Sequence, residues 1–376
     1  MRTIPTTTTS PQVASAATTD APSAQLASEV TAMMRKGHVP GLSLAIVNRE
    51  GLRLAAGFGS ANLQQRTPPT STTEYLWFSM SKIVTATAAM RLADEGQLDL
   101  DAPVGEYVPY LRAPGATQPS TRHLLNHTAG LANPIPIRWA HAVTRHGRDA
   151  ADLLRRQMSH RRAYRYPVGG SARYSNLGYL AAGEVISAAA GERFESYVGK
   201  HVLEPAGMHH TSYTYDDGRP RATGYARVPR VVTPALRAVL PAGVVGRRHG
   251  EFVSLNEFYV DGPAYGGLVG DVLDAAQFLR LHLNEGEVDG HRVLEPATCR
   301  TMQVLDQPGK TLKHGIGWFQ RPTANADWVE HFGSGAGFWN VMRLYPARGI
   351  GVVVMSNSTT SYDFESLFAL VADEYS

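Results

Sequence analysis

Strand-like apolar runs lie at both ends of this chain, with a long middle segment between them, and this layout constrains the fold more than any other feature. Residues 42–47 and 52–58 flank the turn Asn48-Arg-Glu-Gly51, a pattern that predicts a β-hairpin. Further strands are predicted over residues 315–319, 328–332, 338–345 and 350–356. Helical spacing of apolar residues predicts one helix over residues 24–36 and a last one over residues 363–374. Strands from both ends can share one antiparallel sheet flanked by these terminal helices.

The middle of the chain has a largely helical pattern with Pro- and Gly-rich connections. We predict an α+β fold in which residues 23–105 and 300–376 form an α/β sheet lobe and residues 106–299 form a mostly helical lobe. We expect the ligand site between the two lobes. Residues 1–22 are rich in Thr, Ala, Ser and Pro, a composition that predicts a disordered leader. The segment lacks the roughly 7–15-residue apolar core of a secretory signal, and this favours a cytoplasmic location.

Composition argues against several classes of function. The single cysteine, Cys299, excludes a disulfide framework, a thiol-rich metal site and a Cys-x-x-Cys redox centre. No stretch approaches the roughly 18 consecutive apolar residues that cross a bilayer, so we expect no membrane span. The chain has 36 Lys+Arg, but no basic block interleaved with aromatics and no zinc-finger or helix-turn-helix spacing, so we expect no nucleic-acid partner.

The sharpest chemical signal is Ser79-Met80-Ser81-Lys82, at the start of an apolar-periodic stretch that ends at Gly96. Positions i and i+3 share a helix face, so Ser79 Oγ and the Lys82 amine can meet. A serine hydroxyl needs a base to become nucleophilic, and lysine serves as that base when burial or the positive end of a helix lowers its pKa. Ser-x-x-Lys also arises by chance, with the serine as an N-cap and the lysine in solvent, so the motif needs independent support.

Tyr174-Ser175-Asn176 supplies a second set of polar groups, directly before a predicted helix over residues 177–189. Near Lys82, the phenol could hold or relay the serine proton, and the amide could bind the lysine amine or a substrate carbonyl. Taken alone, the segment is equally typical of a turn with a packed aromatic residue.

A glycine-rich segment at residues 331–338 supplies the third element, with His331, Gly333 and Ser334 at its start. Glycines permit close backbone approach, and an N–H at a strand edge could face an oxyanion. Taken alone, this segment is equally typical of a hairpin loop.

In this order, the three elements resemble those of the serine β-lactamase and penicillin-binding-protein superfamily, most closely the class C β-lactamases, D-alanyl-D-alanine carboxypeptidases and family VIII esterases. The resemblance covers nearly everything from about residue 24 to the C-terminus. Supporting segments are His38-Val-Pro-Gly-Leu-Ser-Leu-Ala-Ile-Val, His123-Leu-Leu-Asn-His-Thr-Ala-Gly-Leu, Tyr265-Gly-Gly-Leu and Gly351-Val-Val-Val-Met-Ser-Asn. The resemblance implies a β-lactamase-like fold and a two-step reaction through an acyl-enzyme. We expect no cofactor and no metal.

Position by position, the resemblance implies that Ser79 is the acylated nucleophile and Lys82 its base or proton relay. Tyr174 is similar to the tyrosine that activates the nucleophile and, in deacylation, the attacking water. Asn176 is similar to the asparagine that orients Lys82 and the substrate.

His331 and Gly333 occupy the first and third positions of the superfamily's Lys-Thr-Gly box, and the backbone N–H groups of Ser79 and Ser334 resemble its oxyanion hole. Lys310-Thr311 also resembles the start of this box, but a leucine follows where glycine is required, so we expect Lys310 on the surface. Histidine, with an ordinary pKa of about 6.5, is mostly neutral at pH 7, unlike the lysine of the β-lactamases and carboxypeptidases. Selection for an anionic β-lactam or peptide C-terminus should therefore be weaker, which favours esters.

We predict a serine hydrolase that cleaves a small-molecule carboxylic ester or acyl compound through acyl-Ser79, with Lys82 and Tyr174 as general base. An acyltransferase or transesterase could use the same residues, as could a D-Ala-D-Ala carboxypeptidase or a β-lactamase-type amide hydrolase. A non-catalytic binding protein is disfavoured, because Ser79, Lys82, Tyr174 and Asn176 are all present.

Arginines are concentrated in two stretches of the predicted helical lobe. Residues 134–167 contain eight arginines against two aspartates, and residues 219–249 contain seven arginines and no acidic residue. This pattern predicts either an electropositive rim that attracts an acidic substrate or an acidic carrier protein, or a solvated basic face.

Overall fold

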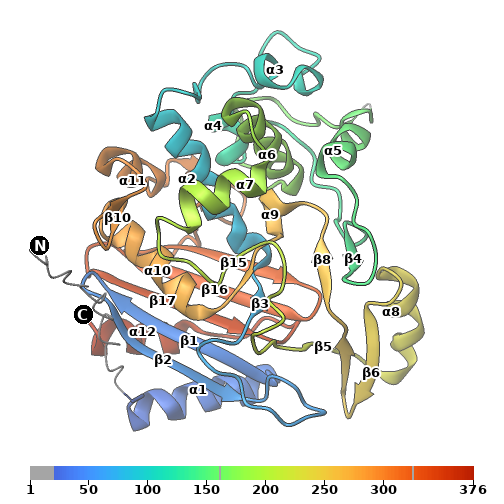
Figure 1. The fold of residues 1–376 in the computed structure, drawn as a ribbon, viewed down its shortest axis with the longest axis vertical. Helices are drawn as coiled ribbons and strands as arrows, with labels where there is room; N and C mark the ends of the chain where they lie inside the picture. The colour runs from blue at the N-terminus through green and yellow to red at the C-terminus, as the bar shows by residue number, and fades with distance from the viewer. Residues whose placement is uncertain (1–20, 161, 324–325) are drawn as a thin grey trace, which may run out of the picture.

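The computed structural model describes residues 21–160, 162–323 and 326–376. The leader predicted over residues 1–22 therefore lies outside the described residues, except for its last two. Within the described ranges, every helix is too short or too polar to cross a membrane. Figure 1 shows a central sheet with helices on both faces and a further group of helices beyond it.

Eight strands form one antiparallel sheet in the spatial order β12-β13-β14-β15-β16-β17-β1-β2. Its strands are β1 (Gly41–Asn48), β2 (Leu52–Gly59), β12 (Gln307–Pro308), β13 (Lys313–His314), β14 (Phe319–Gln320), β15 (Val329–Gly335), β16 (Phe338–Tyr345) and β17 (Ile350–Ser356). Strand β1 pairs with β2 on one side and with β17 on the other, so the prediction that strands from both ends share one sheet is confirmed. Strands β16 and β17 are buried along their whole length, as expected for valine- and aromatic-rich strands covered on both faces.

The strand predicted over residues 315–319 is wrong for all but its last residue. Residues 315–318 form a bend, and only Phe319 lies in β14. Gly317 has a φ of +79°, and a Cβ there would lie 2.8 Å from the Cβ of Ala86 in α2 (Ser81–Asp94). The chain therefore bends closely over α2 instead of extending.

The two terminal helices, α1 (Ala24–Gly37) and α12 (Glu365–Glu374), lie side by side on one face of the sheet, as predicted (Figure 1). Leu26, Val30 and Met33 form the buried stripe of α1, at the spacing of one helix face. Helix α10 (Val272–Leu283) covers the other face, where a Cβ on Gly351 of β17 would lie 2.9 Å from the Cβ of Leu279. The sheet is thus enclosed between helices.

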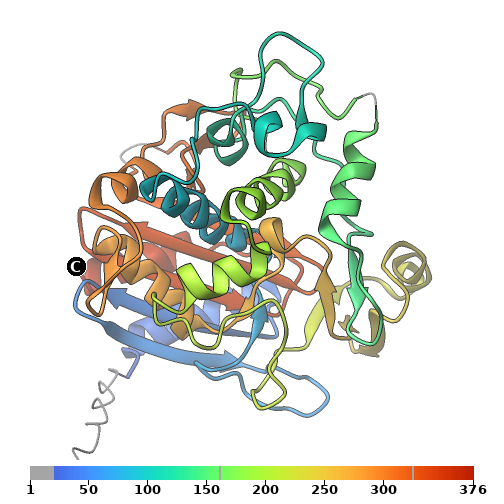
Figure 2. The same cartoon turned by 45° about the horizontal axis from the view of Figure 1, so that its top comes forward.

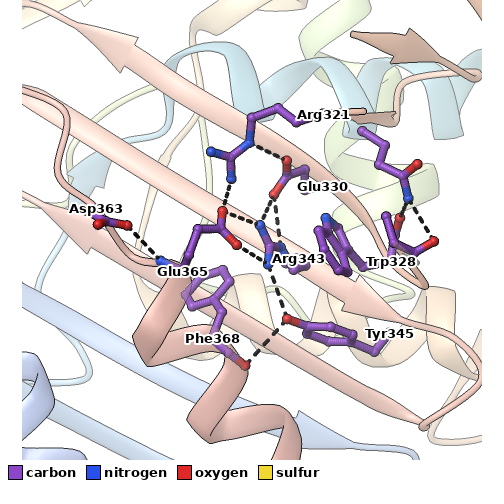
Figure 3. Close-up of polar contacts among 10 residues, drawn as sticks. Arg321, Trp328, Glu330, Arg343, Tyr345, Asp363, Glu365 and Phe368 are labelled. Atoms are coloured by element: carbon purple, nitrogen blue, oxygen red, sulfur yellow. Dashed lines mark hydrogen bonds and ion pairs between the residues drawn. The ribbon is translucent and has the colours of Figure 1, made fainter. Parts of the chain in front are cut away.

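A buried ion cluster fastens α12 to the sheet (Figure 3). Arg343 of β16 and Glu330 of β15 are 1% and 0% exposed, and Arg343 Nη2 donates to Glu330 Oε2 at 2.6 Å. Glu365 of α12 accepts from Arg343 Nη2 at 2.9 Å, and Arg321 Nε donates to Glu330 Oε1 at 3.1 Å. Opposite charges therefore compensate one another, as charges removed from water require.

The middle of the chain gathers around α2 and α6 (Asn176–Ala190), which pack against each other (Figure 2). The other helices are α3 (Val104–Tyr107), α4 (Thr121–Leu125), α5 (Ala150–Met158), α7 (Phe194–Val198), α8 (Thr233–Val239), α9 (Pro263–Gly266) and α11 (Pro296–Met302). The boundaries predicted for the two lobes stay a prediction.

Short strands that the helical pattern does not predict also occur in this middle segment. Three of them form a small sheet in the order β5-β7-β6, and the others form pairs. These strands are β3 (Tyr75–Leu76) with β9 (Val269–Gly270), β4 (Ala140–Ala142) with β8 (Phe258–Val260), β5 (Gly224–Arg227), β6 (Val245–His249), β7 (Phe252–Leu255), and β10 (Glu287–Val288) with β11 (His291–Arg292).

Candidate active site

Ser79 lies in a short 3₁₀ turn, η1 (Phe78–Met80), directly before α2. The turn is held by a backbone hydrogen bond from Trp77 N to Leu268 O, at 2.8 Å. Phe78 has a φ of +47°, a backbone region that is strained for an aromatic residue and is found mainly where the surrounding structure enforces it, often at functional sites. The strained turn leaves Ser79 half-buried at the N-terminal end of α2.

Lys82 follows one helical turn later and is completely buried. Its Nζ lies 3.0 Å from Ser79 Oγ, so the predicted i, i+3 contact is present. The same nitrogen donates to Asn176 Oδ1 at 2.8 Å, at the start of α6, and to the backbone oxygen of Tyr265 at 2.7 Å, in α9. Three segments far apart in the sequence therefore meet at one amine.

Burial lowers the pKa of Lys82 well below its ordinary value. A neutral amine has two N–H bonds and one lone pair. The Asn176 amide oxygen and the Tyr265 carbonyl oxygen can only accept hydrogen bonds, so they take both hydrogens of a neutral Lys82. The lone pair then faces Ser79 Oγ, which is the arrangement that a base for this hydroxyl requires.

Tyr174 lies in the loop before α6, with its ring centroid 4.9 Å from Lys82 Nζ. Burial raises the pKa of Tyr174, and a side-chain hydrogen bond with Ser79 opposes that shift. The phenol is therefore neutral near pH 7 and contacts the same hydroxyl as Lys82. Burial lowers the pKa of Lys82 toward neutral pH and raises the pKa of Tyr174 further above it. Lys82 is therefore the better proton acceptor of the two.

His127 fixes the backbone on both sides of Tyr174. Its carbonyl oxygen accepts from Arg173 N at 2.8 Å, and its Nδ1 accepts from Ser175 N at 3.2 Å. Its ring packs on the Tyr174 ring, with 4.6 Å between the centroids. Burial and the nearby His314 lower the pKa of His127, so its Nδ1 stays available as an acceptor. The left-handed φ of +65° at His127 allows this double contact.

The edge of β15 lies directly against the Ser79 turn. A Cβ on Gly333 would lie 1.9 Å from the backbone oxygen of Trp77, and a Cβ on Gly335 would lie 2.1 Å from the ring of Phe78. At Gly333 a side chain would displace the backbone of the strand or of the turn, so glycine is required there, whereas at Gly335 a side chain would have to displace the Phe78 ring. Ser334, between them, is exposed beside the turn.

His331 is 1% exposed and lies at the inner part of the same strand. Its ring packs on Phe319 at 4.3 Å and lies 6.3 Å from the Tyr174 ring. Burial lowers the pKa of His331 well below its ordinary value. Nδ1 lies 2.7 Å from the backbone oxygen of Phe332, to which it can only donate, so Nε2 is left without a proton. His331 therefore brings no permanent positive charge to the site.

The structure thus brings Lys82 and Tyr174 to the Ser79 hydroxyl and Asn176 to Lys82. Gly333 packs on the Ser79 turn, Ser334 is its exposed neighbour in β15, and His331 lies behind Tyr174. The catalytic roles of all seven predicted residues stay a prediction. Sequence reasoning did not assign roles to His127 or Tyr265, although both lie in segments that carry the family resemblance. Lys310 is exposed, as predicted. Within the described ranges, no group of three or more His, Cys, Asp or Glu side chains is arranged to hold a metal ion.

Comparison with known proteins agrees with this geometry. A family model, Beta-lactamase, matches residues 26–375. Protein flp of Staphylococcus aureus (strain MW2) is 25% identical over 332 residues, which are 88% of this chain and 62% of that protein. Penicillin-binding protein 4 of Amycolatopsis lactamdurans is 24% identical over 353 residues, which are 89% of this chain and 84% of that protein. The chain thus spans about three fifths of the length of the first relative.

Solved structures share the fold. The octameric penicillin-binding protein homologue from Pyrococcus abyssi has a TM-score of 0.74 at 25% identity, over 92% of this chain and 76% of that chain. The D-amino acid amidase from Ochrobactrum anthropi SV3 has a TM-score of 0.74 at 22% identity, over 93% and 96%. EstCE1, described as a hydrolase with promiscuous acyltransferase activity, has a TM-score of 0.69 at 20% identity, over 93% and 97%. Because the family model covers almost the whole described chain and the sheet and helices match the β-lactamase-like fold, this protein belongs to the beta-lactamase family.

Proposed function

We propose that this protein hydrolyses a carboxylic ester through an acyl-Ser79 intermediate, with Lys82 as the general base and Tyr174 as a proton relay. The hydrogen bonding of Lys82 carries the proposal. Two acceptor-only oxygens, from Asn176 and Tyr265, occupy the hydrogens of the buried amine and direct its lone pair at Ser79 Oγ. A purely structural role for Lys82 would not require its lone pair to face a half-buried serine hydroxyl.

In the first half-reaction, Ser79 Oγ attacks the ester carbonyl carbon and its proton passes to Lys82 Nζ, 3.0 Å away. The carbonyl oxygen becomes an oxyanion, which the backbone N–H groups of Ser79 and Ser334 would stabilise. Loss of one such donor typically costs about 2.7–4 kcal/mol of barrier. When the bond between the carbonyl carbon and the alcohol oxygen breaks, that oxygen takes the Tyr174 proton, and Tyr174 is reprotonated by the Lys82 ammonium. A neutral alcohol leaves and acyl-Ser79 remains.

In the second half-reaction, water attacks the acyl carbon and its proton passes to neutral Lys82, either directly or through Tyr174, which gives its own proton to Lys82 as it takes the one from water. Ser79 Oγ leaves and is reprotonated by the Lys82 ammonium, 3.0 Å away, and a carboxylic acid is released. The amine and the phenol both end in their starting states, so the cycle is closed.

The environment of His331 supports a preference for esters. A lysine at this position would offer a permanent charge to an anionic β-lactam or a peptide carboxylate, whereas a buried neutral histidine offers none. An uncharged ester carbonyl needs no such partner.

Acyl transfer and amide hydrolysis are the alternatives that the comparisons favour. EstCE1 is described as a hydrolase with acyltransferase activity, and another structural neighbour is a D-amino acid amidase. If an alcohol or an amine replaced water in the second half-reaction, the same residues would transfer the acyl group. If the leaving group were an amine, the same first step would cleave an amide.

The test is turnover of p-nitrophenyl butyrate by the wild type and by Ser79→Ala, Lys82→Ala and Tyr174→Phe, with Ser28→Ala on the exposed face of α1 as the control. We expect Ser79→Ala and Lys82→Ala to lower kcat/KM by at least about 10³-fold, the scale seen when a nucleophile or its base is removed. Turnover that survives Ser79→Ala would contradict the proposal. Faster cleavage of the matching anilide or of a chromogenic β-lactam would show that the substrate is an amide and not an ester. Formation of the ethyl ester when ethanol is added would show that the protein is an acyltransferase.

A further inference from the structure

The structure divides the arginines of the two basic stretches into paired and free groups. Several form ion pairs: Arg155 with Asp152, Arg219 with Asp271, Arg221 with Asp217 and Glu257, and Arg227 with Glu251. Arg138 and Arg148 differ, because within the described part of the chain neither guanidinium has an ion-pair, hydrogen-bond or ring partner. Asp261, which accepts from the backbone N of Arg148, is itself paired with His141 at 2.5 Å.

Arg138 and Arg148 both line one hollow of about 360 Å³. Its remaining lining residues are Ile135, Ile137, Trp139 and Val239. Ile135 is 77% exposed, and α8, which ends at Val239, has no buried residue at all. Figure 1 shows α8 at one edge of the molecule, beside β4, which begins directly after Trp139. Large apolar side chains left in water around a hollow are typical of a ligand site.

The loop that forms this hollow is anchored at both ends to groups that hold Lys82. At its start, Asn133 Oδ1 accepts from Asn176 N at 3.0 Å. At its end, Trp139 packs edge-on against the Tyr265 ring, with 5.7 Å between the centroids, and its carbonyl oxygen accepts from the Tyr265 hydroxyl at 3.4 Å. Two residues therefore connect the hollow to the Lys82 amine, because Trp139 lines the hollow and contacts Tyr265, whose backbone oxygen accepts from Lys82 Nζ.

We infer that this hollow is a substrate-specificity site that binds an apolar chain or ring carrying a negative charge, with the apolar part against Ile135 and Ile137 and the charge on Arg138 and Arg148. The inference rests on the proposed function, because it assigns the group to the acyl or alcohol side of the ester cleaved at Ser79. A guanidinium binds a carboxylate through two parallel hydrogen bonds, whereas a neutral group of the same shape gains only the apolar contact.

The first test measures binding without turnover. Ser79→Ala protein is titrated with 4-phenylbutyrate and with 4-phenylbutyramide, which has the same shape and no charge. We expect the carboxylate to bind roughly tenfold more tightly. Arg138→Gln with Arg148→Gln should reduce the carboxylate to the affinity of the amide, while Ile135→Ser with Ile137→Ser should weaken both ligands.

Two matched control variants each remove an arginine or an exposed apolar side chain that lies outside the hollow. Arg156→Gln takes away a free exposed arginine that does not line the hollow, and Val304→Ser takes away an apolar side chain that is 55% exposed. Neither should change the affinity. Equal affinities for the two ligands, or equal effects of control and hollow variants, would overturn the inference and show a solvated basic face instead.

The second test locates the bound group on the substrate. One arm compares mono-p-nitrophenyl suberate with p-nitrophenyl octanoate, which places the charge on the acyl side. The other arm compares the acetyl ester of 4-(4-hydroxyphenyl)butyrate with that of its amide, which places the charge on the alcohol side. We expect one arm to show a preference for the charged ester of roughly tenfold in kcat/KM that is lost in Arg138→Gln with Arg148→Gln.

The outcomes separate the two proposals. No preference in either arm, with ester turnover intact, contradicts the specificity site alone. Absence of all ester turnover contradicts the proposed function, and the titrations of Ser79→Ala then still decide whether the hollow binds anionic apolar ligands.

Discussion

Replacing Asn176 with aspartate tests the state of the Lys82 amine. The substitution keeps the size of the side chain and places a carboxylate oxygen where an amide oxygen now lies 2.8 Å from Nζ. Two unit charges about 4 Å apart attract by about 4 kcal/mol at an effective dielectric constant of about 20. One pKa unit corresponds to about 1.36 kcal/mol. Burial of the new carboxylate opposes the attraction, so we expect the pKa of Lys82 to rise by about 1–3 units.

The raised pKa has a defined consequence for the rate. Lys82 acts as a base only when it is neutral, and in the wild type burial keeps its pKa low. In Asn176→Asp, the neutral amine forms only at higher pH, so the acidic limb of kcat/KM against pH should move up by about 1–3 units. At pH values below both limbs, Asn176→Asp should turn over about tenfold more slowly than the wild type for each unit by which the limb moves. Its rate should recover toward that of the wild type as the pH rises.

The assay is ester turnover from pH 6 to 10 for the wild type, Asn176→Asp and Asn176→Ala. The alanine variant removes the same hydrogen bond without adding charge, so it should lower the rate without an upward shift of the limb. Melting temperatures measured in parallel show whether each variant is folded at the assay temperature. An acidic limb that stays in place in Asn176→Asp would refute the reasoning, because the titrating group would not be Lys82.

Three further substitutions test other parts of the account. Gly333→Ala should abolish ester turnover, because the added Cβ would lie 1.9 Å from a backbone oxygen, whereas Gly51→Ala, whose Cβ meets nothing within 4 Å, should leave both turnover and melting temperature unchanged. Glu330→Gln should lower the free energy of unfolding by about 3 kcal/mol, because it leaves Arg343 with a buried and only partly compensated charge; Glu330→Leu with Arg343→Met should recover most of this loss in urea unfolding. His127→Leu should lower kcat roughly tenfold or more with little change in KM, because it removes the acceptor that holds the backbone beside the relay phenol and disfavours the φ of +65°. His127→Asn keeps an acceptor and tolerates that φ, so it should retain more activity than the leucine variant, and equal activities would argue against the positioning role.

The fold follows from the sequence where hydrophobic periodicity is strong. The β1–β2 hairpin, β16, β17 and the two terminal helices lie close to their predicted ranges, because each must bury one continuous apolar face. The bend at residues 315–318 shows the limit. Its apolar residues suit a strand, but Gly317 must pass within contact distance of Ala86, and that constraint comes from tertiary packing.

The contacts of the candidate site also differ in whether the sequence can predict them. The contact between Ser79 and Lys82 is local, so helical spacing predicts it. The contact between Lys82 and Asn176 spans 94 positions, and only the resemblance to a known family suggests it. The backbone oxygen of Tyr265 could not be predicted as a partner, because every residue has such an oxygen and only the fold decides which one faces the amine. The requirement for glycine at Gly333 likewise depends on how closely β15 approaches the Ser79 turn.

In the proposed mechanism, a neutral Lys82 makes Ser79 Oγ nucleophilic, and Ser79 carries the acyl group. The most direct measurement is intact-protein mass after incubation with a fluorophosphonate, for the wild type, Ser79→Ala and Lys82→Ala, followed by peptide mapping. We expect one adduct per wild-type chain, located on Ser79, no adduct on Ser79→Ala and strongly slowed labelling of Lys82→Ala. An adduct on another residue, or labelling of Lys82→Ala at the wild-type rate, would contradict this mechanism.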